Sequence, residues 1–192
     1  MQARSIRTRR WSRREYETLV EGGFFGCHER LELIGGLLLV KEPQGDPHAV
    51  AVDLAAAALR GAFGKAWLVR AHAHVALGRH SRPEPDVYVV SGSPRDYREA
   101  APTRPALVIE VAESRLRFDR GQKASLYARA GVPDYWIVNL VDRVLEVHRE
   151  PARLEPPRRR WGYRSIQTLG PDASVSPLAA PAARIAVADL LP

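Results

Sequence analysis

The sequence contains very little cysteine and no long apolar run. Cys27 is the single cysteine in 192 residues, which excludes an internal disulfide framework and a cysteine-rich zinc site and is typical of a reducing compartment. No apolar run is long enough to span a membrane, and the basic segment Met1–Arg14 lacks the apolar core of a signal peptide. We therefore expect a soluble protein of the cytoplasm.

Lysine is scarce as well, although the chain is basic. Lys41, Lys65 and Lys123 are the only lysines, so arginine supplies most of the positive charge behind the formal net charge of +7. Such an excess favours polyanionic partners such as nucleic acid, and a solvated arginine-rich surface is the alternative explanation. A lysine that coincides with a chemical motif is therefore of particular interest.

What the chain does contain is the composition of an ordinary globular domain. Hydrophobic residues make up 45% and charged residues 27%, and a chain of this length can bury a substantial core. We expect one domain over residues 1–192, with a basic N-terminal arm at residues 1–10 and a proline- and arginine-rich loop or mobile hairpin tip at residues 150–160. Three consecutive arginines of that loop could contact nucleic-acid phosphates, although a solvated loop is the alternative. They are Arg158, Arg159 and Arg160.

Helix and strand signals alternate along the first part of the chain. Ser12 and Glu15 form a capping box, which predicts a short helix after them. Gly35-Gly36 suits a tight turn, so residues 30–40 are expected to form a strand pair. Asp46-Pro47 then predicts the start of a second helix, with the aspartate as N-cap and the proline as first helical residue.

The second helix carries Val50, Leu54, Ala57 and Ala58 at helical spacing. These small apolar side chains predict a face that packs closely against a sheet. His48 lies in the first turn of this helix. It could point at a ligand, and a solvated or capping histidine is the alternative.

Three further strand segments follow from alternation and β-branched residues. A strand over residues 67–77 would place His72 and His74 on one face, at a spacing that permits a metal pair. A polar, solvent-facing surface is the alternative there, because no third ligand stands at a matching spacing. Residues 134–139 and 143–149 predict a strand hairpin.

Two carboxylates lie in apolar, strand-like runs, where an ionised side chain is not expected. Asp86 stands at the start of the run over residues 87–90, and Glu110 lies within the run over residues 106–111. Burying a carboxylate is costly unless it is paired or holds a cation, so we expect these two to share a hard-cation site. Glu32 is a third carboxylate in an apolar strand, and taken alone it fits an outward-facing edge residue.

The carboxylates and one lysine together indicate metal-dependent chemistry. Phosphodiester hydrolysis needs a nucleophilic water and stabilisation of charge on the phosphate oxygens, and divalent ions supply both. Mg²⁺ takes few protein carboxylates and keeps several waters, so Asp86 and Glu110 alone could hold it. A nearby lysine would orient the attacking water or neutralise charge, and Lys123 is the one lysine that we expect in that neighbourhood.

A helix expected over residues 118–131 carries this lysine. Asp119, Lys123 and Tyr127 are four residues apart and therefore share one helical face. Because the helix leaves directly from the strand of Glu110, its first turns could fold back over that carboxylate. This makes Asp119 and Tyr127 accessory site candidates, and an exposed ion pair beside an aromatic ring is the alternative.

Five segments stand in a fixed order along the chain. They are RLELIGG at residues 30–36, PEPD at 83–86, VIEV at 108–111, DRGQK at 119–123 and YARAGVPDYWIV at 127–138. In this order they resemble the PD-(D/E)XK nuclease superfamily and, more narrowly, the Uma-two family of restriction endonuclease-like proteins. The resemblance covers most of the chain from about residue 16 to residue 149. It implies a restriction-endonuclease-like α/β core, with a central mixed β-sheet flanked by helices and a metal site at one edge.

The resemblance also implies residue roles. Asp86 and Glu110 would be ligands of Mg²⁺ or Mn²⁺, Glu32 the acid that positions a metal-bound water, and Lys123 the catalytic lysine. In the superfamily this lysine usually stands two residues after the strand glutamate, where this chain has Ala112. Lys123 must therefore reach the site from the following helix.

The function implied is a metal-dependent DNA endonuclease, and two alternatives stay open. One is a nucleic-acid-binding protein that has the fold without turnover. The other is an oligomeric protein whose acidic cluster is a structural ion-pair network. DNA is the expected partner, and a homodimer or higher homo-oligomer is expected because a two-fold dimer most easily cuts both strands.

Overall fold

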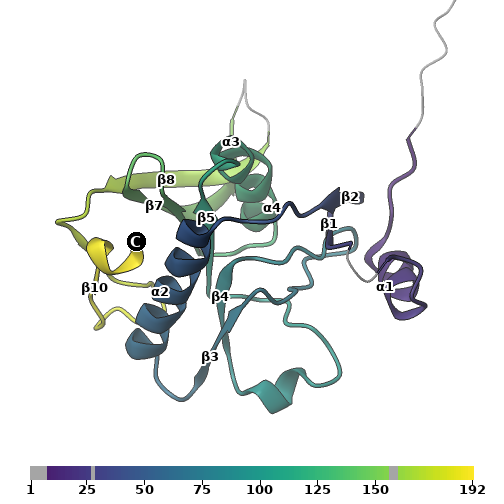
Figure 1. Ribbon diagram of the computed structural model, residues 1–192, viewed down its shortest axis with the longest axis horizontal. Coiled ribbons are helices and arrows are strands. Elements are labelled where there is room, and N and C mark those ends of the chain that lie inside the picture. The colour runs from purple at the N-terminus through teal and green to yellow at the C-terminus, as the bar shows by residue number, and fades with distance from the viewer. Residues whose placement is uncertain (1–7, 27–28, 156–159) are drawn as a thin grey trace, which may run out of the picture.

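The computed structural model describes residues 8–26, 29–155 and 160–192, and its centre is a six-stranded sheet (Figure 1). The strands are β3 (Trp67–Ala71), β4 (Val87–Ser91), β5 (Leu107–Ala112), β6 (Asp134–Asn139), β7 (Val144–Arg153) and β8 (Trp161–Leu169). They are ordered β3-β4-β5-β6-β7-β8, with β5 and β6 parallel and the other neighbours antiparallel. The expected mixed central sheet is therefore confirmed.

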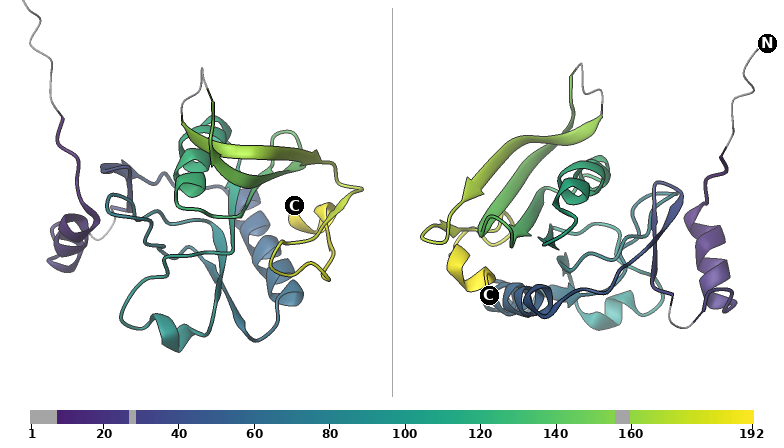
Figure 2. Two further views of the ribbon diagram at one scale, coloured as in Figure 1. Left: turned by 180° about the vertical axis from the view of Figure 1, so that it is seen from behind. Right: turned by 45° about the horizontal axis from the view of Figure 1, so that its top comes forward.

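Helices cover both faces of this sheet (Figures 1 and 2). Helix α2 (Asp46–Ala62) packs on the face that carries Val87 and Val89. The opposite face is covered by a helical segment in three parts. The parts are α3 (Leu116–Phe118), a π-helical turn (Asp119–Lys123) and α4 (Ala124–Arg129). A short 3-10 turn (Pro94–Tyr97) lies between β4 and β5. Because side chains alternate along a strand, the central strands β4, β5 and β6 contribute to the hydrophobic clusters on both faces.

The buried face of α2 differs from the expected one. The helix buries Ala51, Val52, Ala55, Ala56 and Leu59. Val50 is 46% exposed, so the expectation that it packs on the sheet was wrong. Nearly every position in the middle of this helix is apolar, and such a pattern does not select one face. The helix also has Gly45 as its N-cap, one residue before the expected position.

The N-terminal part confirms two local predictions. Ser12 and Glu15 form the capping box of α1 (Arg13–Glu21). Strands β1 (Leu31–Ile34) and β2 (Leu37–Val40) form a hairpin whose Gly35 and Gly36 have φ angles of 58° and 84°. Both views of Figure 2 show α1 beside this hairpin, outside the central sheet. Of the expected basic arm, residues 1–7 lie outside the described part of the chain.

Two expectations about strand limits were wrong. β3 ends at Ala71, because His72 takes a left-handed φ of 48° and turns the chain. His72 is therefore exposed and His74 half-buried, and they share no strand face. The expected loop over residues 150–160 is shorter than predicted, since β7 continues to Arg153 and pairs with β8 across from Trp161.

The C-terminal segment is fixed to the sheet through one buried carboxylate. It contains β9 (Ser174–Val175), β10 (Ile185–Ala186) and a 3-10 turn (Val187–Leu190) that packs against α2. Asp134 is fully buried and accepts hydrogen bonds from Arg149 Nε at 2.9 Å and from the Leu178 N–H at 2.9 Å. Trp136 Nε1 donates a third at 2.7 Å.

We expect Asp134→Asn to lower the free energy of unfolding by about 2 kcal/mol, because charge-assisted hydrogen bonds are weakened and an amide hydrogen must face donors. Urea unfolding measures this change. Asp172→Asn, the same substitution at an exposed position, should leave the unfolding curve within about 0.5 kcal/mol of the unsubstituted protein. Equal curves for both variants would contradict the anchoring role.

Candidate metal and catalytic site

Asp86, which directly precedes β4, lies opposite Glu110 of the neighbouring strand β5. Val87 pairs with Ile109 in the antiparallel ladder of β4 and β5, so the next positions of the register are Asp86 and Glu110. Side chains at such positions have Cβ atoms about 5 Å apart. Both residues are buried, at 6% and 3% exposure.

Asp86 is held by two donors on one of its oxygens. Its Oδ2 accepts from the Val111 N–H at 2.8 Å and lies 3.3 Å from His48 Nε2. Burial acts to raise the pKa of Asp86, but His48, Lys123 and the Val111 N–H together outweigh it and lower that pKa to about 2. The carboxylate is therefore ionised at neutral pH, and its Oδ1 has no hydrogen bond to the described residues.

Glu110 is held in a similar way from the opposite side. Its Oε1 accepts from Lys123 Nζ at 2.9 Å and from the Tyr127 hydroxyl, while its Oε2 has no partner within the described ranges. Burial raises the pKa of Glu110, Lys123 offsets this only in part, and the Asp86 and Asp119 carboxylates raise it further. The pocket thus contains more acidic groups than one lysine can balance.

Glu32 brings a third carboxylate to this place. It lies on β1 at 2% exposure, so it is not the outward-facing edge residue that its strand pattern alone allowed. Its Oε2 accepts from the Glu84 N–H at 3.2 Å and lies 3.6 Å from Lys123 Nζ. The three carboxylates therefore come from three separate strand segments and meet around one amine.

The π-helical turn places Lys123 in the pocket. The expected continuous helix is interrupted by this wider turn, which buries both Asp119 and Lys123. Ala112 lies two residues beyond Glu110 on the same face of β5, at 1% exposure and in the cluster that contains Tyr127. Its small side chain lets the helical segment pack close, and the Lys123 amine enters from that segment. The carboxylates outweigh burial and raise the pKa of Lys123, so the amine stays protonated.

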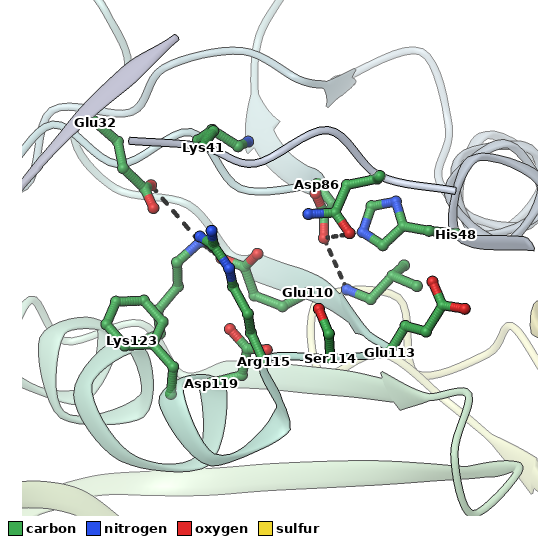
Figure 3. Close-up of a pocket in the computed structure, with 13 residues that line it drawn as sticks. Glu32, Lys41, His48, Asp86, Glu110, Glu113, Ser114, Arg115, Asp119 and Lys123 are labelled. Carbon is green, nitrogen blue, oxygen red and sulfur yellow. Dashed lines mark hydrogen bonds and ion pairs between the residues drawn. The ribbon is translucent and has the colours of Figure 1, made fainter. Parts of the chain in front are cut away.

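Between these side chains lies a cavity of about 40 Å³ (Figure 3). This volume holds a cation with water, which needs at least about 10–15 Å³ per water, and it is far too small for an organic cofactor. The lining residues are Glu32, Lys41, Gln44, His48, Asp86, Glu110, Val111, Glu113, Ser114, Arg115, Phe118, Asp119 and Lys123.

The donor set fits a hard cation that keeps much of its water. Asp86 and Glu110 each have one oxygen fixed by protein donors and one oxygen without a hydrogen bond to the described residues. In the part of the chain that the structure describes, no group of three or more His, Cys, Asp or Glu side chains is arranged so that it could hold a metal ion. Mg²⁺ is bound in proteins through one or two carboxylates plus waters, so two ligands suffice.

The accessory candidates have mixed positions. His48 is 3% exposed and contacts Asp86, so it is neither solvated nor a capping residue. Asp119 lines the cavity, and Tyr127 bonds to Glu110. Arg160 is exposed and does not line the cavity. The other loop candidates, Arg158 and Arg159, lie outside the described residues.

Lys41 and Arg115 line the cavity, although the sequence pattern did not single them out. The expectation that Lys123 is the one lysine near the carboxylates was therefore wrong. The scarcity of lysine was a usable signal for Lys41, because two of only three lysines lie at this cavity. Nothing in the sequence distinguishes Arg115 from the many other arginines.

Comparison with known proteins assigns the chain to a family. The family Uma2, described as "Putative restriction endonuclease", matches residues 14–188, and the chain belongs to it. A similar solved structure is "a putative nuclease belonging to DUF820 from Anabaena variabilis ATCC 29413", with a TM-score of 0.68 and 19% sequence identity. The match covers 90% of this chain and 96% of that chain, and it confirms the expected nuclease-type α/β fold. No curated protein matches the chain.

Among the helices of residues 8–26, 29–155 and 160–192, none combines the length and the apolar composition that crossing a bilayer requires.

Proposed function

We propose that this chain is a metal-dependent DNA endonuclease that hydrolyses phosphodiester bonds through a metal-activated water. The observation that carries the proposal is the meeting of Glu32, Asp86 and Glu110 with the Lys123 amine around one small cavity. Family membership and the nuclease-type fold support DNA as the proposed substrate. The positive net charge of the chain fits a polyanionic substrate.

Each side chain has a distinct task in this proposal. Asp86 and Glu110 would hold Mg²⁺ or Mn²⁺ through their unengaged oxygens. When bound, such an ion lowers the pKa of water and neutralises charge on a phosphate oxygen. Glu32 Oε1, which has no hydrogen bond to the described residues, would position the attacking water and accept a proton from it. Lys123 Nζ is protonated and so stabilises negative charge and does not act as a base.

Neighbouring groups fix the orientations of the two carboxylates that would bind the metal. His48 and the Val111 N–H hold one oxygen of Asp86, and Tyr127 holds one oxygen of Glu110. Groups that orient metal ligands in this way restrict rotation of the carboxylates and favour a single arrangement. A two-fold dimer of the chain would bring two such sites to the two strands of a duplex.

The acidic excess of the cavity favours this proposal over a structural ion-pair network. A structural network is stable when its charges are balanced, and here five acidic side chains line the cavity against two lysines and one arginine. Burial and mutual repulsion already raise the pKa of Glu110 and Asp119. A divalent cation relieves that repulsion.

Nicking of supercoiled plasmid tests the proposal. We expect the unsubstituted protein to convert the plasmid to open-circular and linear forms with Mg²⁺ or Mn²⁺ and to leave it intact with EDTA. DNA binding without cleavage under any of these ions would overturn the enzymatic proposal and favour a binding protein with this fold. Absence of both binding and cleavage at low salt would leave the structural network as the better explanation.

A further inference from the structure

Lys41 reaches the cavity from the end of the β1–β2 hairpin. Its backbone N–H donates to the Arg30 carbonyl at 2.8 Å, which continues the hairpin ladder by one pair beyond Leu31 and Val40. The hairpin thus places Arg30 and Lys41 next to each other. The Lys41 side chain is 12% exposed and lines the same cavity as Asp86 and Glu110.

The Lys41 ammonium is held at one side by Glu84. Nζ donates to the Glu84 backbone carbonyl at 3.0 Å and to Glu84 Oε1 at 3.0 Å. An ammonium has three N–H donors, and no third acceptor is found for Lys41 in the described ranges. Figure 3 shows the amine above the cavity, between Glu32 and Asp86.

Glu84 does not fully balance the positive charge of Lys41. Its Oε1 also accepts from Arg30 Nη2 at 2.6 Å, so two cations share one carboxylate. The Lys41 ammonium therefore shares its counter-charge with the Arg30 guanidinium and can pair with a further anion.

Positive charge at the entrance of an acidic cavity favours the approach of an anionic ligand. The DNA backbone must approach Glu32, Asp86 and Glu110, which repel it, so cations at the entrance are needed to hold the phosphates. Arg115 lines the cavity as well, its side chain 36% exposed and its nearest carboxylate, Glu42, 4.0 Å away. Figure 3 shows both Lys41 and Arg115 among the side chains that line the cavity.

We propose that Lys41 is a substrate-binding residue whose ammonium contacts a backbone phosphate of nucleic acid at the entrance of the cavity. The inference rests on the proposed nuclease function for the identity of the ligand. The proposed contact is with a phosphodiester group and does not depend on base sequence, because a lysine ammonium binds phosphate as a point charge. Glu84 positions the ammonium, and the Glu84 N–H holds Glu32 at the same time.

The salt dependence of DNA binding tests the inference. Fluorescence anisotropy of a labelled 30-base-pair duplex is measured over a range of NaCl with Ca²⁺ present at fixed concentration, and a gel checks that the duplex stays intact. Lys41→Gln should reduce the slope of log K against log[salt] by about 1 and weaken binding about five- to tenfold at 0.1 M salt. Lys41→Arg, which keeps the charge, should retain the slope.

Lys65→Gln is the matched control. Lys65 is exposed and follows the C-terminal end of α2, about 20 Å or more along that helix from His48 in its first turn. The control removes the same charge, so an equal loss in both glutamine variants would show a general charge effect and overturn the inference. An unchanged slope in Lys41→Gln would overturn it as well.

The outcomes separate this inference from the proposed function. Cleavage by the unsubstituted protein with normal binding by Lys41→Gln would overturn the phosphate contact alone. Lys41-dependent binding without cleavage under Mg²⁺ or Mn²⁺ would overturn the enzymatic proposal and support the phosphate contact. Thermal melting of each variant verifies folding, and a Lys41→Gln variant that fails to fold is replaced by Lys41→Met, judged against Lys65→Met by the same criteria.

Discussion

Asp86→Asn and Glu110→Gln are each expected to reduce Mg²⁺-dependent plasmid cleavage by about 10³-fold. Each substitution replaces a charged ligand oxygen with a neutral one, and charge stabilisation by a bound metal contributes several kcal/mol to the transition state, at about 1.4 kcal/mol per tenfold in rate. Both side chains are buried and nearly isosteric with their amides, so the loss should be catalytic. Initial rates of nicking under saturating Mg²⁺ measure it.

The control for this prediction is Asp53→Asn. Asp53 is exposed on α2, and the substitution makes the same chemical change away from the cavity. Its rate should equal that of the unsubstituted protein within about twofold. Cleavage that persists in Asp86→Asn or in Glu110→Gln at the control rate would contradict the assignment of that residue as a metal ligand.

Lys123→Met is expected to lower the free energy of unfolding by about 3–5 kcal/mol without metal, because it leaves buried carboxylates uncompensated. The ammonium is 2.9 Å from Glu110 Oε1 and 3.6 Å from Glu32 Oε2, and the side chain is 6% exposed. Adding Glu110→Gln to this variant should recover part of the loss, because the double variant no longer contains the carboxyl group that lay closest to the lost ammonium. Urea unfolding of both single variants and the double variant measures the coupling.

Lys65→Met provides the matched change at an exposed position, where we expect an effect within about 0.5 kcal/mol. Strictly additive effects of Lys123→Met and Glu110→Gln would contradict the ion pair as a stabilising contact. A Lys123→Met variant as stable as the control would show that the acidic groups are balanced in another way.

The sequence predicted the strands of the site better than its helices. Asp86 and Glu110 were recognisable because a carboxylate in an apolar, β-branched run has no local explanation, and the structure places both on paired strands. The capping box before α1 and the Gly35-Gly36 turn were also recognisable, because each depends on residues close in sequence. Features that depend on residues close in sequence can be predicted without knowledge of the tertiary structure.

Tertiary contacts account for what the sequence did not predict. His48 is buried because α2 brings its first turn to Asp86, a neighbour 38 positions away along the chain. Lys41 belongs to the cavity because Glu84 holds it there. The length of β3 was overestimated, since nothing in the alternation around His72 signals a left-handed turn at a residue other than glycine.

The π-helical turn shows the same limit. The four-residue spacing of Asp119, Lys123 and Tyr127 predicted a shared face, and all three are buried toward the cavity or the sheet. The wider turn that interrupts the helix leaves no mark in the composition of residues 119–123. The position of the amine relative to Glu110 therefore required coordinates.

A crystal of the protein soaked in Mn²⁺ and measured near the manganese absorption edge tests the central claim most directly. We expect one strong anomalous peak in the cavity, within about 2.5 Å of an oxygen of Asp86 and an oxygen of Glu110. The same soak of Asp86→Asn should give a weak peak or none. A cavity without anomalous signal at millimolar Mn²⁺, or an ion bound only elsewhere on the chain, would contradict the claim that these carboxylates form a metal site.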